Sequence, residues 1–235
     1  MQSGVEQHPL YGEIRTTINT RARRIILRAR EGFIEVVLPP YVSRKAYEDA
    51  LAKYGEKLSA ISREKRPAII DADYKVDTAN FRFSLSACAG NKFQMRYNAH
   101  EATLYYPSAT DFDFGSSELQ QWLRRVRVVA LRRVAGEYLP LRLRQLAAEH
   151  GLRYNAVTLR DSHSRWGSCS NRGNISLSIY LQLLPAHLAD YVMLHELCHT
   201  REMNHGDRFW QLMDSVTCGK AKMLRAELKA YKTDF

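Results

Sequence analysis

The chain has 235 residues, of which 45% are hydrophobic and 26% are charged, so it can build a large core and wholesale disorder is excluded. No apolar run approaches the ~20 residues of a membrane-spanning helix. The first residues lack the basic and apolar segments of a secretory signal, so we expect a cytoplasmic protein with no membrane partner. The net charge of +10 is compatible with an anionic partner such as nucleic acid, but composition alone favours a well-solvated surface.

The first third of the chain predicts a hairpin followed by a helix. Residues 23–30 and 33–40 alternate apolar with polar side chains on either side of a turn at Glu31 and Gly32. Ser43 is placed to cap a helix, because apolar residues recur behind it at helical spacing.

Three more segments with strand-like alternation follow, at residues 81–87, 92–98 and 101–107. Together with the hairpin, they suggest a single antiparallel sheet over residues 11–106. The turn-rich stretch that comes next marks a change to helical periodicity. We therefore expect an α+β protein with two domains, a β-rich N-terminal region over residues 1–112 and a helical domain with a small sheet over residues 113–235.

The second domain is predicted to begin with two helices. The first would be interrupted at Gly136 and Pro140, and the second would end at Gly151, which suits the left-handed conformation of a helix C-terminus. Short strands are expected at residues 155–161 and 174–181. Three helices complete the chain, one beginning near Pro185 and the others spanning roughly residues 207–217 and 220–232.

The segment HELCHTREMNH holds three histidines, His195, His199 and His205, and a glutamate, Glu196, directly after the first. Residues four apart on a helix point toward one place from successive turns, so His195 and His199 can bind one metal ion. Glu196 is displaced around the helix to where a carboxylate can reach a metal-bound water, which is the HExxH arrangement. Because neutral imidazoles suit Zn²⁺, we expect one zinc ion.

His205 can join this site only if the chain turns, because on a continuous helix it would lie ~9 Å farther along the axis. We expect the turn after about residue 203, with Asn204 as a left-handed pivot. Glu227, on the last predicted helix, is the alternative third ligand. A helix whose histidines merely pack in the core is the alternative to a metal site, but it would leave two imidazoles facing inward without partners.

Several other residues have two interpretations. Arg165, His163 and Tyr191 are candidates to stabilise an oxyanion, although Tyr191 can equally be packing. Asp207 either orients a ligand histidine or caps the next helix. The strand at residues 174–181 either offers a serine face and a free edge to an extended peptide or is an ordinary sheet strand.

Aromatic residues and cysteines near these motifs are expected mainly in the core. Trp166, Phe209 and Trp210 are more typical of core than of a substrate pocket. The four cysteines are far apart and form no CxxC pair, which argues against a zinc ribbon and indicates buried, reduced thiols. Cys198, inside the histidine segment, is therefore interpreted as packing.

The segment from residue 154 to residue 217 closely resembles the YgjP-like metallopeptidases, a zincin family. The motifs that carry this resemblance are RWGSC, HELCH, and the pairs NH and FW that follow HELCH. The family is similar to the SprT-like and WLM proteases, which act on proteins crosslinked to DNA. The resemblance implies a minigluzincin-like catalytic domain in which His195, His199 and His205 hold zinc and Glu196 is the base.

The sequence therefore predicts a zinc-dependent metallopeptidase that acts on peptide or protein substrates. A second class of function, a nucleic-acid-binding protein with a structural zinc, is suggested by arginines at residues 21–24 and along the helix at residues 118–135. Structural zinc usually has four protein ligands, which speaks against this alternative. A protease recruited to DNA would combine both functions.

Overall fold

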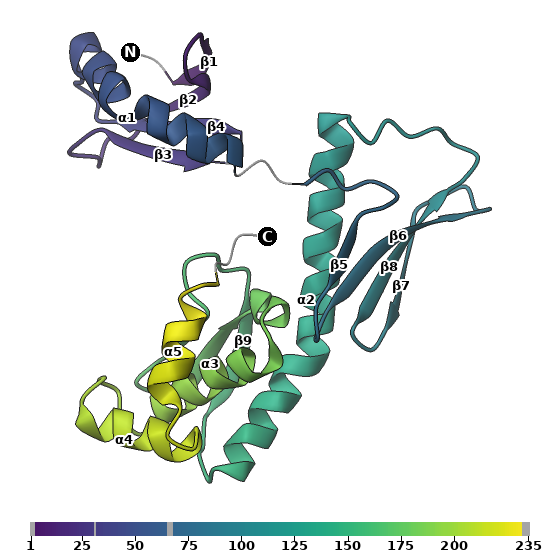
Figure 1. The fold of residues 1–235 in the computed structure, drawn as a ribbon, viewed down its shortest axis with the longest axis vertical. Coiled ribbons are helices and arrows are strands. Elements are labelled where there is room, and N and C mark those ends of the chain that lie inside the picture. Colours follow the sequence, from purple (N-terminus) through teal and green to yellow (C-terminus); the bar gives the residue numbers. More distant parts are fainter. Residues whose placement is uncertain (1–2, 31, 65–67, 232–235) are drawn as a thin grey trace. The chain divides into compact units, whose positions relative to one another are not determined.

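The computed structural model describes residues 3–30, 32–64 and 68–231, and its contacts divide the chain into two compact units, residues 1–68 and 69–235 (Figure 1). The fold is mixed α+β, as the sequence predicts. The contacts divide the chain after residue 68, and the second sheet shares its core with the helix that follows it. The expected domain boundary between residues 112 and 113 stays a prediction.

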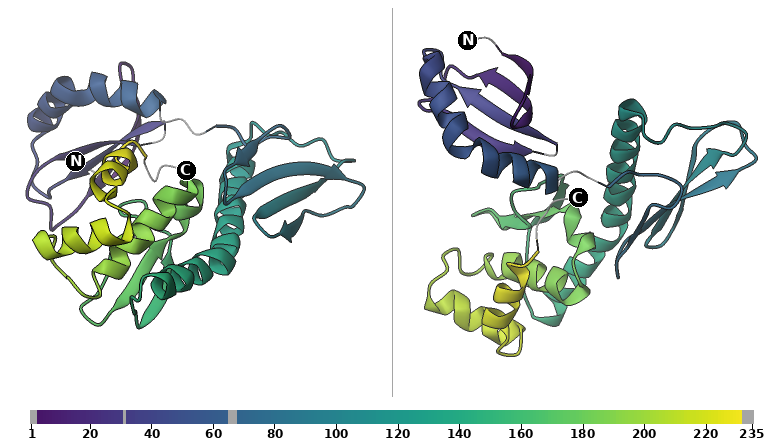
Figure 2. Two further views of the ribbon diagram at one scale, coloured as in Figure 1. Left: turned by 60° about the horizontal axis from the view of Figure 1, so that its bottom comes forward. Right: turned by 45° about the horizontal axis from the view of Figure 1, so that its top comes forward.

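The first unit is a four-stranded sheet with one helix packed on it (Figure 2). Along the chain, its elements are β1 (Gly4–His8), β2 (Gly12–Ile18), β3 (Ile26–Arg30), β4 (Phe33–Leu38) and α1 (Arg44–Glu64). In the sheet, the strands lie in the order β1-β2-β4-β3. The predicted hairpin is β3 and β4, with Gly32 at a φ of 80° in its turn; Glu31 lies outside the described residues. Ser43 caps α1 as expected, because its Oγ accepts a hydrogen bond from the Ala46 amide at 3.2 Å.

The second unit begins with a sheet of the same strand order. Its elements are β5 (Lys75–Asp77), β6 (Arg82–Cys88), β7 (Gln94–Asn98) and β8 (Glu101–Pro107), in the order β5-β6-β8-β7. In both sheets the two central strands pair parallel, β2 with β4 and β6 with β8. The predicted single antiparallel sheet is therefore wrong, because the last strand of each group inserts between the hairpin partner before it and an earlier strand.

The helix α2 (Ser117–Glu149) is continuous over 33 residues, so the expected interruption at Gly136 and Pro140 is wrong. A proline inside a helix loses one hydrogen bond and crowds the carbonyl four residues earlier, at a cost of ~3 kcal/mol. That earlier residue is Gly136, whose backbone adjusts freely. The fully buried Leu131 and Leu139 on either side offset the cost through packing. Gly151, at a φ of 61°, follows the helix as predicted.

A small sheet follows, with β9 (Ala156–Arg160), β10 (Gly167–Cys169) and β11 (Asn174–Ser178) in the order β10-β11-β9. β11 pairs antiparallel with β10 and parallel with β9. Of the two interpretations of the strand at residues 174–181, the free edge is wrong because β11 has a partner on each side, and β10 is an edge strand instead. The end of that segment forms the short 3₁₀ helix η1 (Ile179–Leu183).

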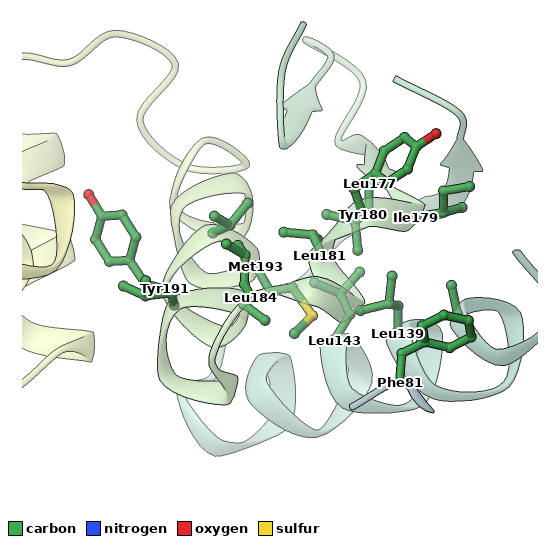
Figure 3. Packing of buried hydrophobic residues seen from close by; sticks show 14 of the residues in the cluster. Phe81, Leu139, Leu143, Leu177, Ile179, Tyr180, Leu181, Leu184, Tyr191 and Met193 are labelled. Carbon is green, nitrogen blue, oxygen red and sulfur yellow. The ribbon is translucent and has the colours of Figure 1, made fainter. Parts of the chain in front are cut away.

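Three helices, α3 (Ala186–Cys198), α4 (Asp207–Val216) and α5 (Ala221–Leu228), close the second unit. Figure 3 shows side chains from α2, η1 and α3 in one core, among them Leu143, Leu181 and Met193. This core supports α3 and the small sheet, which carry the residues of the candidate site. Within the described residues, no helix is both long and apolar enough to cross a membrane.

Candidate metal centre

The three histidines of the HELCHTREMNH segment meet at one place. The Nε2 atoms of His195 and His199, on successive turns at the end of α3, are 3.2 Å apart. The Nε2 atom of His205 lies 3.0 Å from that of His195. The structure thus brings together the three ring nitrogens that the sequence predicts as metal ligands.

The chain turns back toward the site after α3. α3 ends at Cys198, and the amides of Arg201 and Glu202 both donate to the Cys198 carbonyl, at 3.0 and 2.9 Å. Asn204 does not have the left-handed conformation expected of a pivot. The expectation of a left-handed pivot is therefore wrong, and hydrogen-bonded turns follow the helix directly instead.

The ring of Phe209, on α4, packs against all three imidazoles. Its centroid lies 4.9, 4.6 and 4.8 Å from those of His195, His199 and His205 respectively. Phe209 is fully buried, which confirms the expected core position, but the sequence did not indicate its contact with the histidines. It forms an apolar wall that restricts the orientation of the rings. Trp166 and Trp210 are half-buried against the same core.

The environment keeps the two helical imidazoles neutral. Burial, together with the nearby His199 and His205, lowers the pKa of His195 to about 3. Burial likewise lowers the pKa of His199. The Nδ1 of His199 lies 3.1 Å from the Glu202 carbonyl oxygen, so Nδ1–H donates there and Nε2 keeps its lone pair for the site. Neutral imidazoles are the form that binds a metal.

Glu196 lies beside the histidines in a nearly closed environment, with 6% of its surface exposed. Burial raises the pKa of its carboxyl to about 7, against an opposing effect of Arg165. A Cβ atom at Gly167 of β10 would lie 2.7 Å from the Glu196 side chain. The edge strand can therefore approach the carboxyl only because residue 167 is glycine, a role that the motif RWGSC did not reveal.

Residues with alternative interpretations lie outside this group. Glu227 bonds to His187, with 2.7 Å between Oε1 and Nε2, and does not join the three histidines. Asp207 is the first residue of α4 and makes no capping hydrogen bond. Tyr191 is 3% exposed with its ring centroid 6.2 Å from that of His195, a packing contact.

The cysteines do not contribute to the group of three histidines. Cys198 is fully buried, as expected, and burial raises the pKa of its thiol to about 12. Cys218 is exposed, while Cys88 and Cys169 are half-buried, so the prediction of buried thiols is wrong for Cys218. All four are free thiols.

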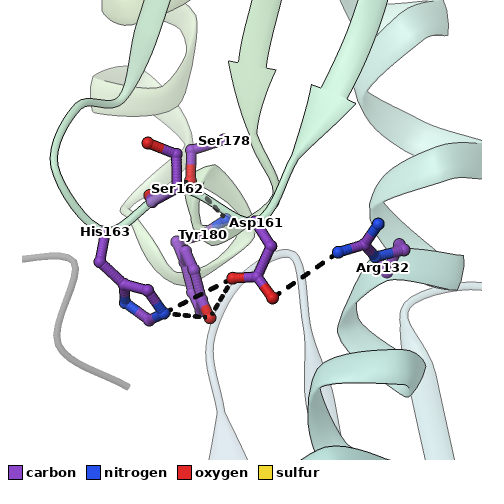
Figure 4. Close-up of polar contacts among 6 residues, drawn as sticks. All are labelled: Arg132, Asp161, Ser162, His163, Ser178 and Tyr180. Carbon is purple, nitrogen blue, oxygen red and sulfur yellow. Dashed lines mark hydrogen bonds and ion pairs between the residues drawn. The ribbon is translucent and has the colours of Figure 1, made fainter.

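His163, a predicted oxyanion candidate, belongs to a separate polar cluster (Figure 4). The Tyr180 hydroxyl donates to Asp161 Oδ1 at 2.8 Å and lies 2.8 Å from His163 Nε2. Arg132 of α2 pairs with the other oxygen of Asp161 at 3.6 Å. Burial, strengthened by the bond to Asp161, raises the pKa of Tyr180 well above its usual value. This cluster anchors the start of the loop between β9 and β10.

The donor set fits a zinc ion. Zinc bonds to imidazole nitrogen at ~2.0–2.1 Å, so tetrahedral ligands place their nitrogens roughly 3.3 Å apart. The separations of 3.2 and 3.0 Å from His195 to its two neighbours approach this value. Three ring nitrogens beside a buried carboxyl are the set of groups expected of a mononuclear metal site of the hydrolytic class.

Comparison with family models identifies the class more closely. Residues 23–231 match the model described as YgjP-like, metallopeptidase domain, so the chain belongs to the YgjP-like metallopeptidase family. A search of curated proteins finds no match. Among solved structures, the metallopeptidase zymogen of Pyrococcus abyssi abylysin is similar at 22% identity and a TM-score of 0.35, over 38% of this chain and 90% of that chain.

Proposed function

We propose that this metallopeptidase is zinc-dependent, with one Zn²⁺ held by His195, His199 and His205 and with Glu196 as the general base. The observation that carries the proposal is the convergence of three ring nitrogens, two of them on neutral helical imidazoles, beside a buried carboxyl. Three protein donors leave a fourth position for water or substrate, which is typical of catalytic zinc.

The roles follow from the chemistry of these groups. Bound zinc supplies Lewis acidity, which polarises the scissile carbonyl and makes water a better nucleophile at neutral pH. Glu196 accepts the proton of the attacking water and returns it to the leaving amine. Phe209 limits the mobility of the imidazoles, and the Glu202 carbonyl sets the tautomer of His199.

The proposed substrates are peptides or proteins. β10 is an edge strand, and its Gly167 adjoins Glu196. An extended peptide that paired with β10 would therefore pass next to the carboxyl. This edge takes the place of the one that the sequence suggested on β11.

The alternative of a structural zinc in a nucleic-acid-binding protein receives less support. A structural site usually has four protein ligands, whereas the group found among the described residues has three. Recruitment of the protease to DNA is not favoured by a particular contact. Salt-dependent DNA binding by the zinc-loaded protein would be the evidence for it.

Glu196→Gln tests the base assignment. We expect this variant to bind zinc stoichiometrically and to lose cleavage of a panel of unstructured peptides, because the amide cannot accept the proton. Glu202→Gln is the matched control, because it makes the same substitution at a position between His199 and His205 in the sequence. The backbone carbonyl of residue 202, which His199 contacts, is unchanged in this variant. Cleavage by zinc-loaded Glu196→Gln at the wild-type rate would refute the assignment.

His205→Ala tests the third ligand. We expect zinc affinity to fall at least about 10²-fold, whereas Glu227→Ala should leave it unchanged, because Glu227 pairs with His187. Competition with a chromogenic chelator measures both affinities. The opposite ranking of the two variants would make Glu227 the ligand.

A further inference from the structure

One face of the β9–β10–β11 sheet lines a groove with a volume of about 900 Å³, here called the sheet groove. The other face packs into the core, where Ile175 and Leu177 of β11 are buried. The side chains that line the groove are mainly small, and six of the lining residues are serines. Its polar side chains include Thr158, Arg160, Arg165, Ser168, Ser176 and Ser178.

The strand register builds a polar row across this face. Ser176 of β11 pairs with Thr158 on one side and with Ser168 on the other. The Ser176 hydroxyl lies 3.1 Å from that of Thr158 and accepts a hydrogen bond from Arg160 Nε at 2.7 Å. One nitrogen of Arg160 is thus fixed to the sheet, and its terminal nitrogens make no hydrogen bond or ion pair within the described residues.

The sheet groove has a positive charge that its own lining does not balance. Its lining residues include Arg160 and Arg165 and no aspartate or glutamate. Arg165 is exposed and forms no hydrogen bond or ion pair with another residue in the described ranges. A guanidinium group in this state can bind a carboxylate through two parallel hydrogen bonds.

The groove is continuous with the residues of the proposed catalytic site. Gly167 lines the groove and also contacts Glu196. The loop that carries Arg165 is held by the cluster in Figure 4, and the Ser178 hydroxyl donates to the Ser162 carbonyl at 2.9 Å. Arg165 is therefore presented from an anchored loop close to the reacting groups.

We propose that the sheet groove selects acidic peptide segments, with Arg160 and Arg165 binding substrate carboxylates and the hydroxyl side chains binding the substrate backbone. The proposal rests on the proposed peptidase function and adds a substrate class to it. Cleavage is then directed to bonds beside clusters of aspartate or glutamate. The net charge of +10 brings such substrates to the protein at long range.

Nucleic acid is also anionic, but the groove favours peptide. Proteins that bind single strands stack the bases on aromatic side chains. The lining of the groove includes no phenylalanine, tyrosine or tryptophan. Its hydroxyl-bearing lining and its position beside Glu196 fit an extended peptide better.

A binding experiment tests the proposal independently of catalysis. Fluorescein-labelled Asp-Ala and Asn-Ala repeat peptides of equal length are titrated with the full-length protein, metal-free and zinc-loaded, and followed by anisotropy. We expect the acidic peptide to bind about tenfold tighter or more in both forms, because charge-assisted hydrogen bonds are roughly twice as strong as neutral ones. A preference seen only with zinc would overturn the proposal, since carboxylates would then be binding the ion.

Variants assign the preference to the groove. The double variant Arg160→Gln with Arg165→Gln should bind both peptides equally, while retaining zinc and the wild-type tryptophan emission. Arg172→Gln is the matched control, because Arg172 is exposed at the neighbouring turn and does not line the groove. An unchanged preference in the double variant would overturn the proposal.

Two further outcomes are distinguishable. If a labelled oligothymidine binds through the same two arginines while the two peptides bind alike, the groove is a nucleic-acid site and the proposal is wrong. If the acidic peptide binds as expected but zinc-loaded protein cleaves no peptide, the binding inference holds and the proposed peptidase function fails.

Discussion

The chain builds one topology twice, with different results. The sheets β1-β2-β4-β3 and β5-β6-β8-β7 share strand order and a central parallel pair, and each is followed by a long helix. The first sheet and α1 form a small core of their own, whereas the second contributes to the large core that also contains residues of α2, α3 and the small sheet. Shared topology therefore does not imply a shared role, because only the second sheet belongs to the core that supports the histidines.

The largest difference between the two sheets should appear when an equivalent core residue in each is replaced with alanine. Ile34 on β4 and Leu104 on β8 lie in the parallel pairs and are 0% and 2% exposed. Replacing either with alanine should cost about 2–5 kcal/mol of unfolding free energy. Ile34→Ala should affect the first unit and leave zinc affinity unchanged, while Leu104→Ala should destabilise the unit that holds the metal centre.

The tryptophans make this difference measurable. All three, Trp122, Trp166 and Trp210, lie in the second unit. In urea unfolding, tryptophan fluorescence should report Leu104→Ala, while Ile34→Ala should shift only the far-ultraviolet circular dichroism. Equal shifts of both signals in both variants would mean that the two units unfold together.

Gly167→Ala should reduce activity without unfolding either unit. The new Cβ would lie 2.7 Å from the Glu196 side chain, so the carboxyl must move. A displacement of about 1 Å can cost roughly 10²-fold in kcat/KM. Gly4→Ala, in β1 of the first unit, is the control, because its Cβ would meet no atom within 4 Å. Wild-type kcat/KM with zinc-loaded Gly167→Ala would contradict the proposed role of Glu196.

The sequence predicted the convergence of the three histidines better than it predicted the surroundings of the site. His195, Glu196 and His199 follow from helical spacing, and His205 from the need for a turn. The contact of Phe209 with the imidazoles depends on how α4 packs against α3, which local periodicity does not encode. The role of Gly167 likewise depends on tertiary packing, because it arises from the approach of β10 to Glu196 on α3, which is distant in the sequence.

The errors about the fold have a common physical origin. The alternation of apolar and polar residues identifies strands, but it does not indicate which strands pair. The parallel pairs in both sheets therefore cannot be predicted from it. Pro140 taken by itself predicts the end of a helix, but the buried leucines along α2 outweigh the cost of the proline. In each case tertiary packing decided between alternatives that local sequence leaves open.

Acid should affect the second unit of metal-free protein more than the first. His195 has a folded pKa of about 3, below its ordinary 6.5, so the unfolded chain binds a proton that the folded chain does not. The stability that the neutral ring contributes is present above pH 6.5 and is lost as the pH falls toward 3, by up to about 1.4 kcal/mol per pH unit. In the described part of the first unit, no carboxyl or imidazole side chain is buried, since the buried polar residues are Thr16, Ser59 and Ser62.

The carboxyl of Glu196 changes the stability with pH in the opposite direction to His195. The contribution of His195 is therefore visible only in a variant that lacks this carboxyl. Its folded pKa of about 7 is raised, so its contribution is present below pH 4.5 and is lost as the pH rises through 7. Between pH 4.5 and 6.5 it therefore offsets His195 in the wild type. Metal-free Glu196→Gln should lose stability on going from pH 6.5 to 5, more steeply than the wild type, as measured by urea midpoints from tryptophan fluorescence. Parallel pH profiles for the two proteins would contradict these shifts.

The smallest effect is expected at an ion-pair cluster on the first sheet. Glu35 of β4 accepts hydrogen bonds from Arg30 at 3.0 and 2.7 Å, and Arg28 lies 3.5 Å away. Although burial acts to raise it, these arginines hold the pKa of Glu35 below its usual value. The arginine side chains are about half exposed, so Glu35→Gln should cost no more than about 1 kcal/mol. The second sheet has the neutral Thr103 at the corresponding place beside the parallel partner strand.

Salt and pH distinguish this small electrostatic effect from a loss of packing. The difference between wild type and Glu35→Gln, measured by far-ultraviolet circular dichroism in urea, should shrink in 1 M sodium chloride because exposed ion pairs are screened. It should also vanish in acid, once the folded Glu35 carboxyl becomes protonated at a pH below the usual value for glutamate. Tryptophan fluorescence should not respond, since Glu35 belongs to the unit without tryptophan. A difference that persists in salt would mean that Glu35 acts through packing of its side chain, so the first sheet would depend on its exposed face as well as on its small core.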